Sequence, residues 1–182
     1  MNTIKGTQGS ITLEACMVVP IFIIIMLLAN GFFLMFTGQQ VMAHALLQSS
    51  KSLAFDPYAS QRVADDEQDK LANMFVDIFT FGHGNYISTE QWYKEESEDL
   101  EEVIKTRFTA YLRSSEESAS DLLEIVGVKN GLDGLDFSGS TVEDGFLTIK
   151  LKYTQDFVFN AAGLASFERE IDVKIKLFNY VQ

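Results

Sequence analysis

One stretch near the amino terminus constrains this chain more than any other. Residues 15–36 contain no charged side chain and are mostly aliphatic or aromatic. As an α-helix they would rise about 33 Å at ~1.5 Å per residue, which is enough to cross a bilayer hydrocarbon core of ~30 Å. The sequence therefore predicts one membrane-spanning helix at this position.

Glu14 lies directly before this apolar stretch. An ionised carboxylate within a membrane costs roughly 2.5–3.5 kcal/mol or more, so we expect Glu14 to have a partner or a task. Gly9 and Ser10 precede it, with Glu14 as the fifth residue counted from Ser10. Pro20 follows Glu14 by six residues and is expected to bend or loosen the helix, because it removes a backbone donor.

This combination of Gly9-Ser10, Glu14, Pro20 and an apolar helix resembles the class III signal of type IV prepilins. More narrowly, it is similar to the TadE/TadF-like pseudopilins of tight-adherence (Tad) pilus systems. The resemblance covers about residues 5–36. It implies cleavage between Gly9 and Ser10 by a membrane aspartyl prepilin peptidase, whose substrate this chain would be. It also implies that Glu14 pairs with the new α-amino group, on the same or a neighbouring subunit, and sets subunit registry in a filament.

Two other readings of the amino terminus were weighed. In the first, the span is an uncleaved signal anchor, and Glu14 extends to the membrane interface. In the second, it is a secretory signal peptide, since residues 43–45 read Ala-His-Ala. An apolar core of 22 residues exceeds the usual 7–15 of a signal peptide, and the Ala-His-Ala lies far beyond it. The Gly9–Glu14 spacing together with Pro20 favours cleavage over the plain anchor, so we favour cleavage after Gly9 over either alternative.

Composition limits the classes of partner. The chain has 182 residues and a net charge of −12, with most of the acid after residue 60. This length accommodates one membrane segment and one modest domain. An acidic domain argues against nucleic acid or anionic lipid as a partner. Cys16 is the only cysteine, so no intramolecular disulfide is expected, and it is interpreted as a small buried hydrophobe.

The chain divides into four predicted parts. Residues 1–9 form the leader, and residues 10–55 form a long pilin-like helix that Asp56-Pro57 is expected to end. Residues 56–128 form an acidic helical region with helices predicted over 61–81, 90–113 and 116–126. The second of these helices is expected to bury Trp92, Leu100, Ile104, Phe108, Tyr111 and Leu112.

From residue 129 the apolar period changes from that of a helix to that of a strand. Alternating residues predict two half-buried strands, at 147–153 and 171–177, and a third over 135–141 joined to the next by a hairpin turn at 142–145. Residues 129–182 are therefore expected to form a small antiparallel sheet covered on one face. The predicted class is α+β: a long N-terminal transmembrane helix, a helical insertion and the sheet.

The sequence offers little basis for catalysis. His44 and His83 are the only histidines and give no zinc signature. Asn130, Asp133 and Asp136 lack the spacing of an EF-hand and are interpreted as a turn. We expect no enzymatic activity, metal, cofactor or small-molecule substrate.

The function predicted from these features is that of a minor pseudopilin-like structural subunit of a Tad-type pilus or secretion apparatus. It would be processed after Gly9 and assembled through its N-terminal helix. The expected partners are the prepilin peptidase, other pilin or pseudopilin subunits and the bacterial cytoplasmic membrane. The chain would cross that membrane once, with its C-terminal domain extracytoplasmic. The alternative is a single-pass membrane-anchored binding or sensor domain that does not polymerise.

Overall fold

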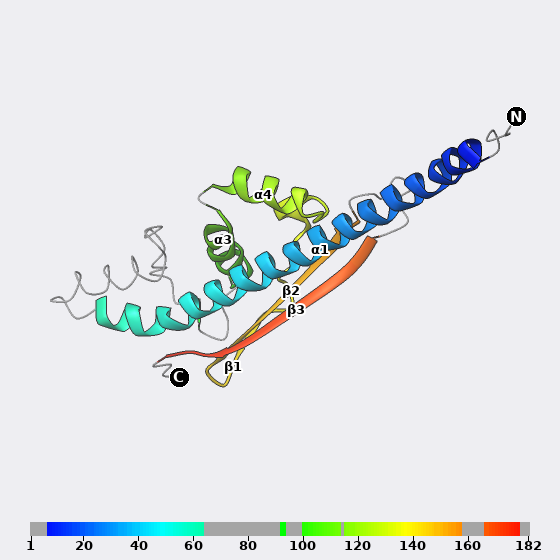
Figure 1. The fold of residues 1–182 in the computed structure, drawn as a ribbon. Coiled ribbons are helices and arrows are strands. Elements are labelled where there is room, and N and C mark those ends of the chain that lie inside the picture. Colours follow the sequence, from blue (N-terminus) through cyan, green and yellow to red (C-terminus); the bar gives the residue numbers. More distant parts are fainter. Residues whose placement is uncertain (1–6, 64–91, 94–99, 114, 158–165, 179–182) are drawn as a thin grey trace, which may run out of the picture.

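The computed structural model describes residues 7–63, 92–93, 100–113, 115–157 and 166–178 (Figure 1). A long N-terminal helix is followed by two short helices, a single 3-10 turn and a three-stranded antiparallel sheet, so the α+β prediction is confirmed. The elements are α1 (Thr7–Val63), α3 (Leu100–Leu112), α4 (Glu116–Ile125), η1 (Gly131–Gly134), β1 (Thr141–Glu143), β2 (Phe146–Asp156) and β3 (Ser166–Lys176).

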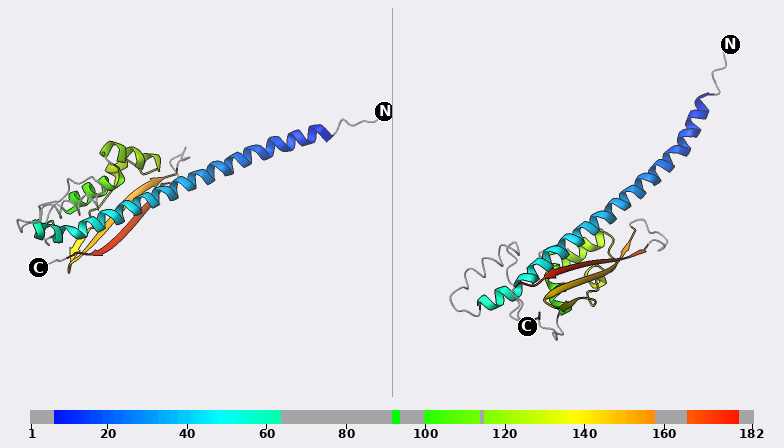
Figure 2. Two further views of the ribbon diagram at one scale, coloured as in Figure 1. Left: turned by 60° about the vertical axis from the view of Figure 1, so that its left-hand side comes forward. Right: turned by 90° about the horizontal axis from the view of Figure 1, so that it is seen from below.

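Helix α1 dominates the shape of the molecule. Its 57 residues correspond to about 85 Å at ~1.5 Å per residue. Figures 1 and 2 show that the other described elements, called here the head, pack against the C-terminal part of α1 only. The N-terminal part of α1 projects from the head with no other described element beside it.

The helix runs past the predicted end at residue 55 and continues through Pro57 to Val63. A proline inside a helix removes one backbone donor and leaves carbonyl groups of the preceding turn without their usual partners. Pro57 cannot donate to the Leu53 carbonyl four residues before it; at the next carbonyl, that of Ala54, the backbone N–H of Phe178 from the head donates at 2.9 Å. The rings of Phe55 and Phe178 stack with their centroids 4.4 Å apart. Contacts from the end of the chain thus accompany the continuation past Pro57.

The helical region agrees with the prediction in part. Helix α4 matches residues 116–126 closely, and the Ser115 side chain accepts a hydrogen bond from the backbone of Ser118 as its N-cap. In the predicted helix over 90–113, the structure shows helix only from Leu100, and Trp92 lies in a turn. The predicted helix over 61–81 lies outside the described residues after Val63. The predicted buried stripe is confirmed in part. Ile104, Phe108 and Leu112 of α3 are buried, and Leu100 and Tyr111 are partly buried against the core. Trp92 is buried as well, but in the turn and not on the helix.

The sheet has the order β1-β2-β3, and both pairings are antiparallel. The β2–β3 register places Leu147 opposite Ile175 and Leu151 opposite Ile171, so apolar residues share one face as their alternation predicted. A two-residue turn joins β1 to β2. Its residues have positive φ angles, 52° at Asp144 and 73° at Gly145, as the right-handed twist of a tight hairpin favours.

The prediction of the first strand over 135–141 was wrong for most of its length. The strand begins only at Thr141, and the preceding residues make a single isolated bridge between Asp136 and Lys152. A turn interrupts pairing there, because the Ser138 backbone N–H donates to the Asp136 carboxylate at 2.9 Å and the Ser140 N–H to the Phe137 carbonyl at 3.0 Å. The local turn chemistry outweighs the strand propensity of these residues.

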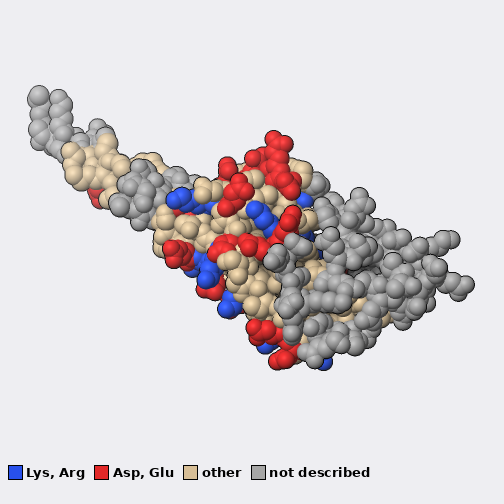
Figure 3. All heavy atoms as spheres, turned by 180° about the vertical axis from the view of Figure 1, so that it is seen from behind, with Lys and Arg blue, Asp and Glu red and all other residues tan. Residues whose placement is uncertain are grey.

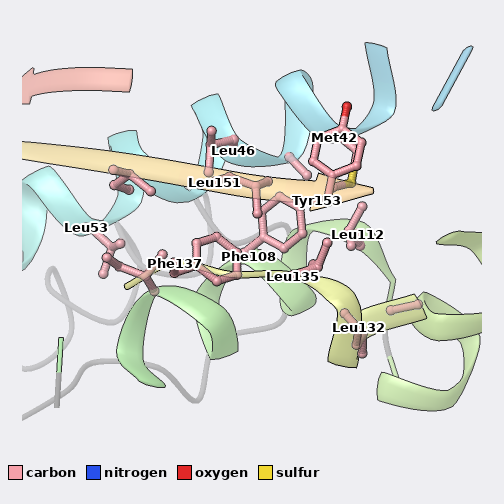
Figure 4. Close-up of a cluster of buried hydrophobic side chains, with 14 of the residues drawn as sticks. Met42, Leu46, Leu53, Phe108, Leu112, Leu132, Leu135, Phe137, Leu151 and Tyr153 are labelled. Carbon is pink, nitrogen blue, oxygen red and sulfur yellow. The ribbon is translucent and has the colours of Figure 1, made fainter. Parts of the chain in front are cut away.

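One hydrophobic core joins α1, α3, η1 and the inner face of the sheet (Figure 4). The rings of Phe108 on α3 and Phe137 before β1 meet at 5.5 Å between centroids, close to edge to face. Leu46 and Leu53 of α1 and Leu151 of β2 are fully buried beside them. The C-terminal half of α1 is therefore part of the core of the head.

Candidate functional site: the N-terminal helix and its junction with the head

The four residues of the predicted signal lie along the first third of α1. Gly9 and Ser10 fall just after the helix start at Thr7, and Glu14 follows one turn after Ser10. Glu14 is exposed and makes no hydrogen bond or ion pair within the described part of the chain. Pro20 is exposed inside the uninterrupted helix. The structure aligns these residues on one rod and brings no group of the head to them.

The surface around them is apolar on every side. Large side chains from Leu13 to Leu28 are 43–66% exposed, and they cover the whole circumference of the helix. In the described residues, α1 is the one helix long and apolar enough to cross a membrane. Figure 3 shows acidic and basic groups over the head, whereas the projecting part of α1 is largely without them.

From Gly31 onward, one side of α1 is buried under the head. Eight buried positions recur at alternating intervals of four and three residues, which keeps them along one line of the helix. Most of these eight are small or polar, which lets the head approach the helix backbone closely. They are Gly31, Met35, Gly38, Met42, Ala45, Ser49, Ser52 and Asp56, and the face widens from residue 46 onward to include Leu46, Ser50, Leu53, Ala54 and Pro57.

The two glycines on this face are sites of close approach. A Cβ at Gly31 would lie 2.5 Å from the ring of Phe157, which also packs edge-on against Phe32 at 5.3 Å between centroids. A Cβ at Gly38 would lie 2.8 Å from the side-chain nitrogen of Gln155. The chain's own Phe157 thus occupies the space that the missing side chain of Gly31 leaves.

Gln155 ties the end of β2 to α1 and α4. It is fully buried, and its Nε2 donates to the Met35 carbonyl at 3.2 Å and to the Val126 carbonyl at 2.9 Å. Both acceptors are backbone atoms, so this contact depends on the position of the two helices rather than on particular side chains. It holds the end of the head nearest the N-terminus of α1 against the helix.

A buried ionic cluster fixes the other end. Arg107 of α3 donates through Nη2 to Asp56 Oδ2 at 2.8 Å and through Nη1 to Ser52 Oγ at 2.6 Å. The indole nitrogen of Trp92 donates to the same Asp56 oxygen at 3.0 Å. The side chains of Arg107 and Asp56 are only 4% and 8% exposed. This cluster joins three segments that are far apart in the sequence.

Burial controls the ionisation of this cluster. Loss of hydration raises the pKa of Asp56 to about 6, outweighing the attraction of Arg107 and the hydrogen bonds from Trp92 and Arg107.

Two groups outside this cluster also have shifted pKa values. Burial raises the pKa of the Tyr153 phenol, although the positive charge of Arg169 opposes the shift. The exposed Asp136 has a lowered pKa, because the side chain and backbone of Ser138 hydrogen-bond to its carboxylate.

The other residues considered for chemistry are dispersed. His44 is exposed on α1, and His83 lies outside the described residues. Cys16 is exposed on the projecting part of α1, not buried within the chain as interpreted from the sequence. Asn130 adopts a left-handed conformation and leads into η1, so this segment forms the turn that was favoured. No group of three or more candidate metal ligands occurs among the residues described.

Sequence reasoning missed the face of α1 that holds the head and the buried cluster at Asp56. The four-and-three spacing of mostly small or polar residues from Gly31 to Asp56 is visible in the sequence, but the pattern alone does not show which distant segments cover it. No local signal identifies Arg107 as the partner of Asp56, because 51 residues separate them.

No known family model, curated protein or solved structure matches this chain.

Proposed function

We propose that this chain is a minor pseudopilin-like structural subunit of a Tad-type pilus or secretion apparatus, processed after Gly9 and assembled through its N-terminal helix. The observation that carries the proposal is the bare, uncharged stretch of α1 that projects from the head directly after Glu14. Such a rod with a small α+β head is the plan that a pilin-like subunit requires.

The projecting stretch requires a nonaqueous environment. Fully burying one Val, Leu, Ile, Phe or Met side chain contributes about 1.5–3 kcal/mol, and this stretch presents such side chains in every direction. Lipid satisfies them before assembly, and neighbouring apolar helices satisfy them in a filament. A helix that is apolar on all sides is thus suited to pass from one environment to the other.

Glu14 supplies the specificity that apolar packing lacks. In the continuous helix, Ser10 and Glu14 are four residues apart and share one face. Cleavage after Gly9 would create an α-amino group at Ser10 beside this carboxylate. In an apolar surrounding, each charge requires the other, so a filament gains from a registry in which every Glu14 meets an amine.

The processing signal before the apolar stretch and the acidic residues after it favour one orientation. The amino terminus would lie in the cytoplasm and the acidic head on the extracytoplasmic side of the bacterial cytoplasmic membrane. At 182 residues the chain is long for the small major pilin of such systems. A low-copy initiating or tip role fits this size better.

N-terminal sequencing of the membrane-extracted protein, from a host that carries a prepilin peptidase, tests the proposal. The expected first residue is Ser10, and a Gly9→Val variant is expected to retain Met1. If the wild-type protein retains Met1 in that host, the proposal fails and the non-polymerising membrane anchor is the better reading.

The registry role needs a separate experiment. Glu14→Ala is expected to insert normally but to lose the oligomers that chemical cross-linking traps in membranes. Lys51→Ala removes one exposed charge from the same helix and serves as the matched control. Equal cross-linking of the Glu14→Ala variant and the wild type would rule out the registry role.

A further inference from the structure

We infer that the membrane-proximal end of the head enters the interface of the bilayer, with Phe157 and Phe167 in contact with lipid. The partner is a zwitterionic lipid surface. The inference rests on the proposed membrane insertion of α1 and adds a second contact to it. At this end of the head β2 ends and β3 begins, on the side nearest the N-terminus of α1 (Figures 1 and 2).

The depth of the junction follows from the length of the helix. If Glu14 marks one edge of a hydrocarbon core of ~30 Å, the opposite edge lies about 20 residues later, near Leu34. The ring of Phe157 packs on Gly31, which is three residues, or roughly 4.5 Å, inside that edge. Tilting the helix moves the edge toward Gly38 and places Phe157 deeper. The head therefore begins below the level at which the hydrocarbon ends.

The described charges of the head nearest to this level are Asp156, directly before Phe157, and Glu168, directly after Phe167. The sequence from Phe157 through Phe167 contains no Asp, Glu, Lys or Arg. The flanking pair, Asp156 and Ser166, hydrogen-bond to each other at 2.5 Å between Oδ1 and Oγ. Arg169 lies beside Gln39, whose side-chain oxygen accepts from it at 3.2 Å when the amide is oriented toward the guanidinium. Gln39 is five residues past Leu34, or about 7.5 Å into the headgroup region.

The apolar groups at this end are exposed in the isolated chain. Phe167 is 42% exposed, and Phe32 and Phe33 of the adjoining helix are 51% and 69% exposed. Phe167 lies opposite Gln155 in the sheet, with the Arg169 guanidinium 5.7 Å from its ring centroid. Aromatic rings and the stems of basic side chains near a membrane surface bury their apolar part in lipid and keep the charge in the headgroups.

The rigid attachment of this end determines what the contact does. Gln155 and Phe157 hold the end of β2 against α1 through the Met35 carbonyl and the Gly31 backbone. A second lipid contact on a head that is attached to α1 limits how far α1 tilts and which of its sides tilts toward the membrane. The sheet is then presented at one orientation to the membrane before any neighbouring subunit binds.

Depth-dependent fluorescence quenching tests the inference on the full chain. Single cysteines replace Phe167, Phe22 and Glu143 in a Cys16→Ala background and carry an environment-sensitive fluorophore. The labelled proteins are reconstituted in phosphatidylcholine vesicles whose lipids bear a nitroxide either just below the headgroup or near the acyl end. Glu143 in β1 lies at the opposite end of the sheet and is the matched control (Figure 1).

The label at position 22 is expected to be quenched by the deep nitroxide. The shallow nitroxide is expected to quench the label at position 167 severalfold more strongly than the label at position 143. A label at Ser166, exposed and next to Phe167, gives an independent reading if the Phe167 substitution disturbs folding. Quenching at Phe22 with none above the Glu143 level at either position 166 or 167 overturns the inference and leaves membrane insertion intact. Absence of quenching at Phe22 overturns membrane insertion itself, and the inference with it.

Discussion

The buried cluster of Asp56, Arg107, Ser52 and Trp92 allows the sharpest prediction about stability. Arg107→Met keeps most of the side-chain volume but removes the ion pair at 2.8 Å and the hydrogen bond to Ser52. Asp56 then remains a buried carboxylate whose described donors reduce to the Trp92 indole. Breaking a buried pair from one side costs about 3–5 kcal/mol, which is a large share of the 5–15 kcal/mol of a typical domain.

Two companion variants separate this mechanism from a general packing defect. Asp56→Asn/Arg107→Met removes both charges and retains an acceptor for Trp92, so it should recover about 2 kcal/mol or more relative to Arg107→Met alone. Lys105→Met, on the same helix, breaks a pair with Asp133 whose atoms are 3.9 Å apart and well exposed. Its expected cost is below about 1 kcal/mol.

The measurement is urea unfolding of the full chain in detergent micelles at pH 7, followed by tryptophan fluorescence. Trp92 is the only tryptophan and lies inside the cluster, so the signal reports on this part of the molecule. An Arg107→Met cost below that of Lys105→Met, or a double variant as unstable as Arg107→Met, would refute the electrostatic reasoning.

Three further predictions concern pH, close approach and the hairpin. Folding raises the pKa of Asp56 from 3.8 to about 6, so the folded state binds the proton more tightly than the unfolded state. The free energy of unfolding of the wild type, measured relative to Asp56→Asn by urea titration, should therefore rise by up to about 3 kcal/mol as the pH falls from 7 to 4. A difference between the two proteins that stays constant over this pH range would contradict the prediction. Gly38→Val should destabilise the protein by about 1–3 kcal/mol, since its Cβ would meet Gln155 and Val126 within about 3 Å. The urea midpoint should fall accordingly, and an unchanged midpoint would mean that the head does not dock at Gly38. Gly145→Ala places a Cβ at a φ of 73° and should cost about 1–2 kcal/mol in the same assay; no loss would indicate a different turn.

Much of the secondary structure followed from local pattern. The apolar alternation around Leu151 and Val173 predicted β2 and β3, and the helical spacing of Ile104 and Phe108 predicted the buried side of α3. The end of α1 did not follow from local pattern. Pro57 is a local stop signal, yet α1 continues past it. The contacts beside it come from Phe178, which donates to the Ala54 carbonyl and stacks on Phe55 although it lies more than 100 residues away in the sequence.

The sequence by itself determined that residues 15–36 form a helix apolar enough to cross a membrane, because the absence of charge over 22 residues is a local property. It also determined the order of Gly9, Ser10, Glu14 and Pro20 along that helix. The sequence alone does not show where the exposed apolar part of the helix ends and the part covered by the head begins, since no Asp, Glu, Lys or Arg occurs between Glu14 and Lys51.

Only the tertiary structure decided where the head begins. Phe157 and Gln155 reach α1 from more than 100 residues away, and they find space there because Gly31 and Gly38 lack side chains. Burial of the face that follows leaves residues before Gly31 as the freely exposed part of the helix. The physical reason is that close packing depends on the shapes of both contacting surfaces, and the residues that form these two surfaces lie far apart in the sequence.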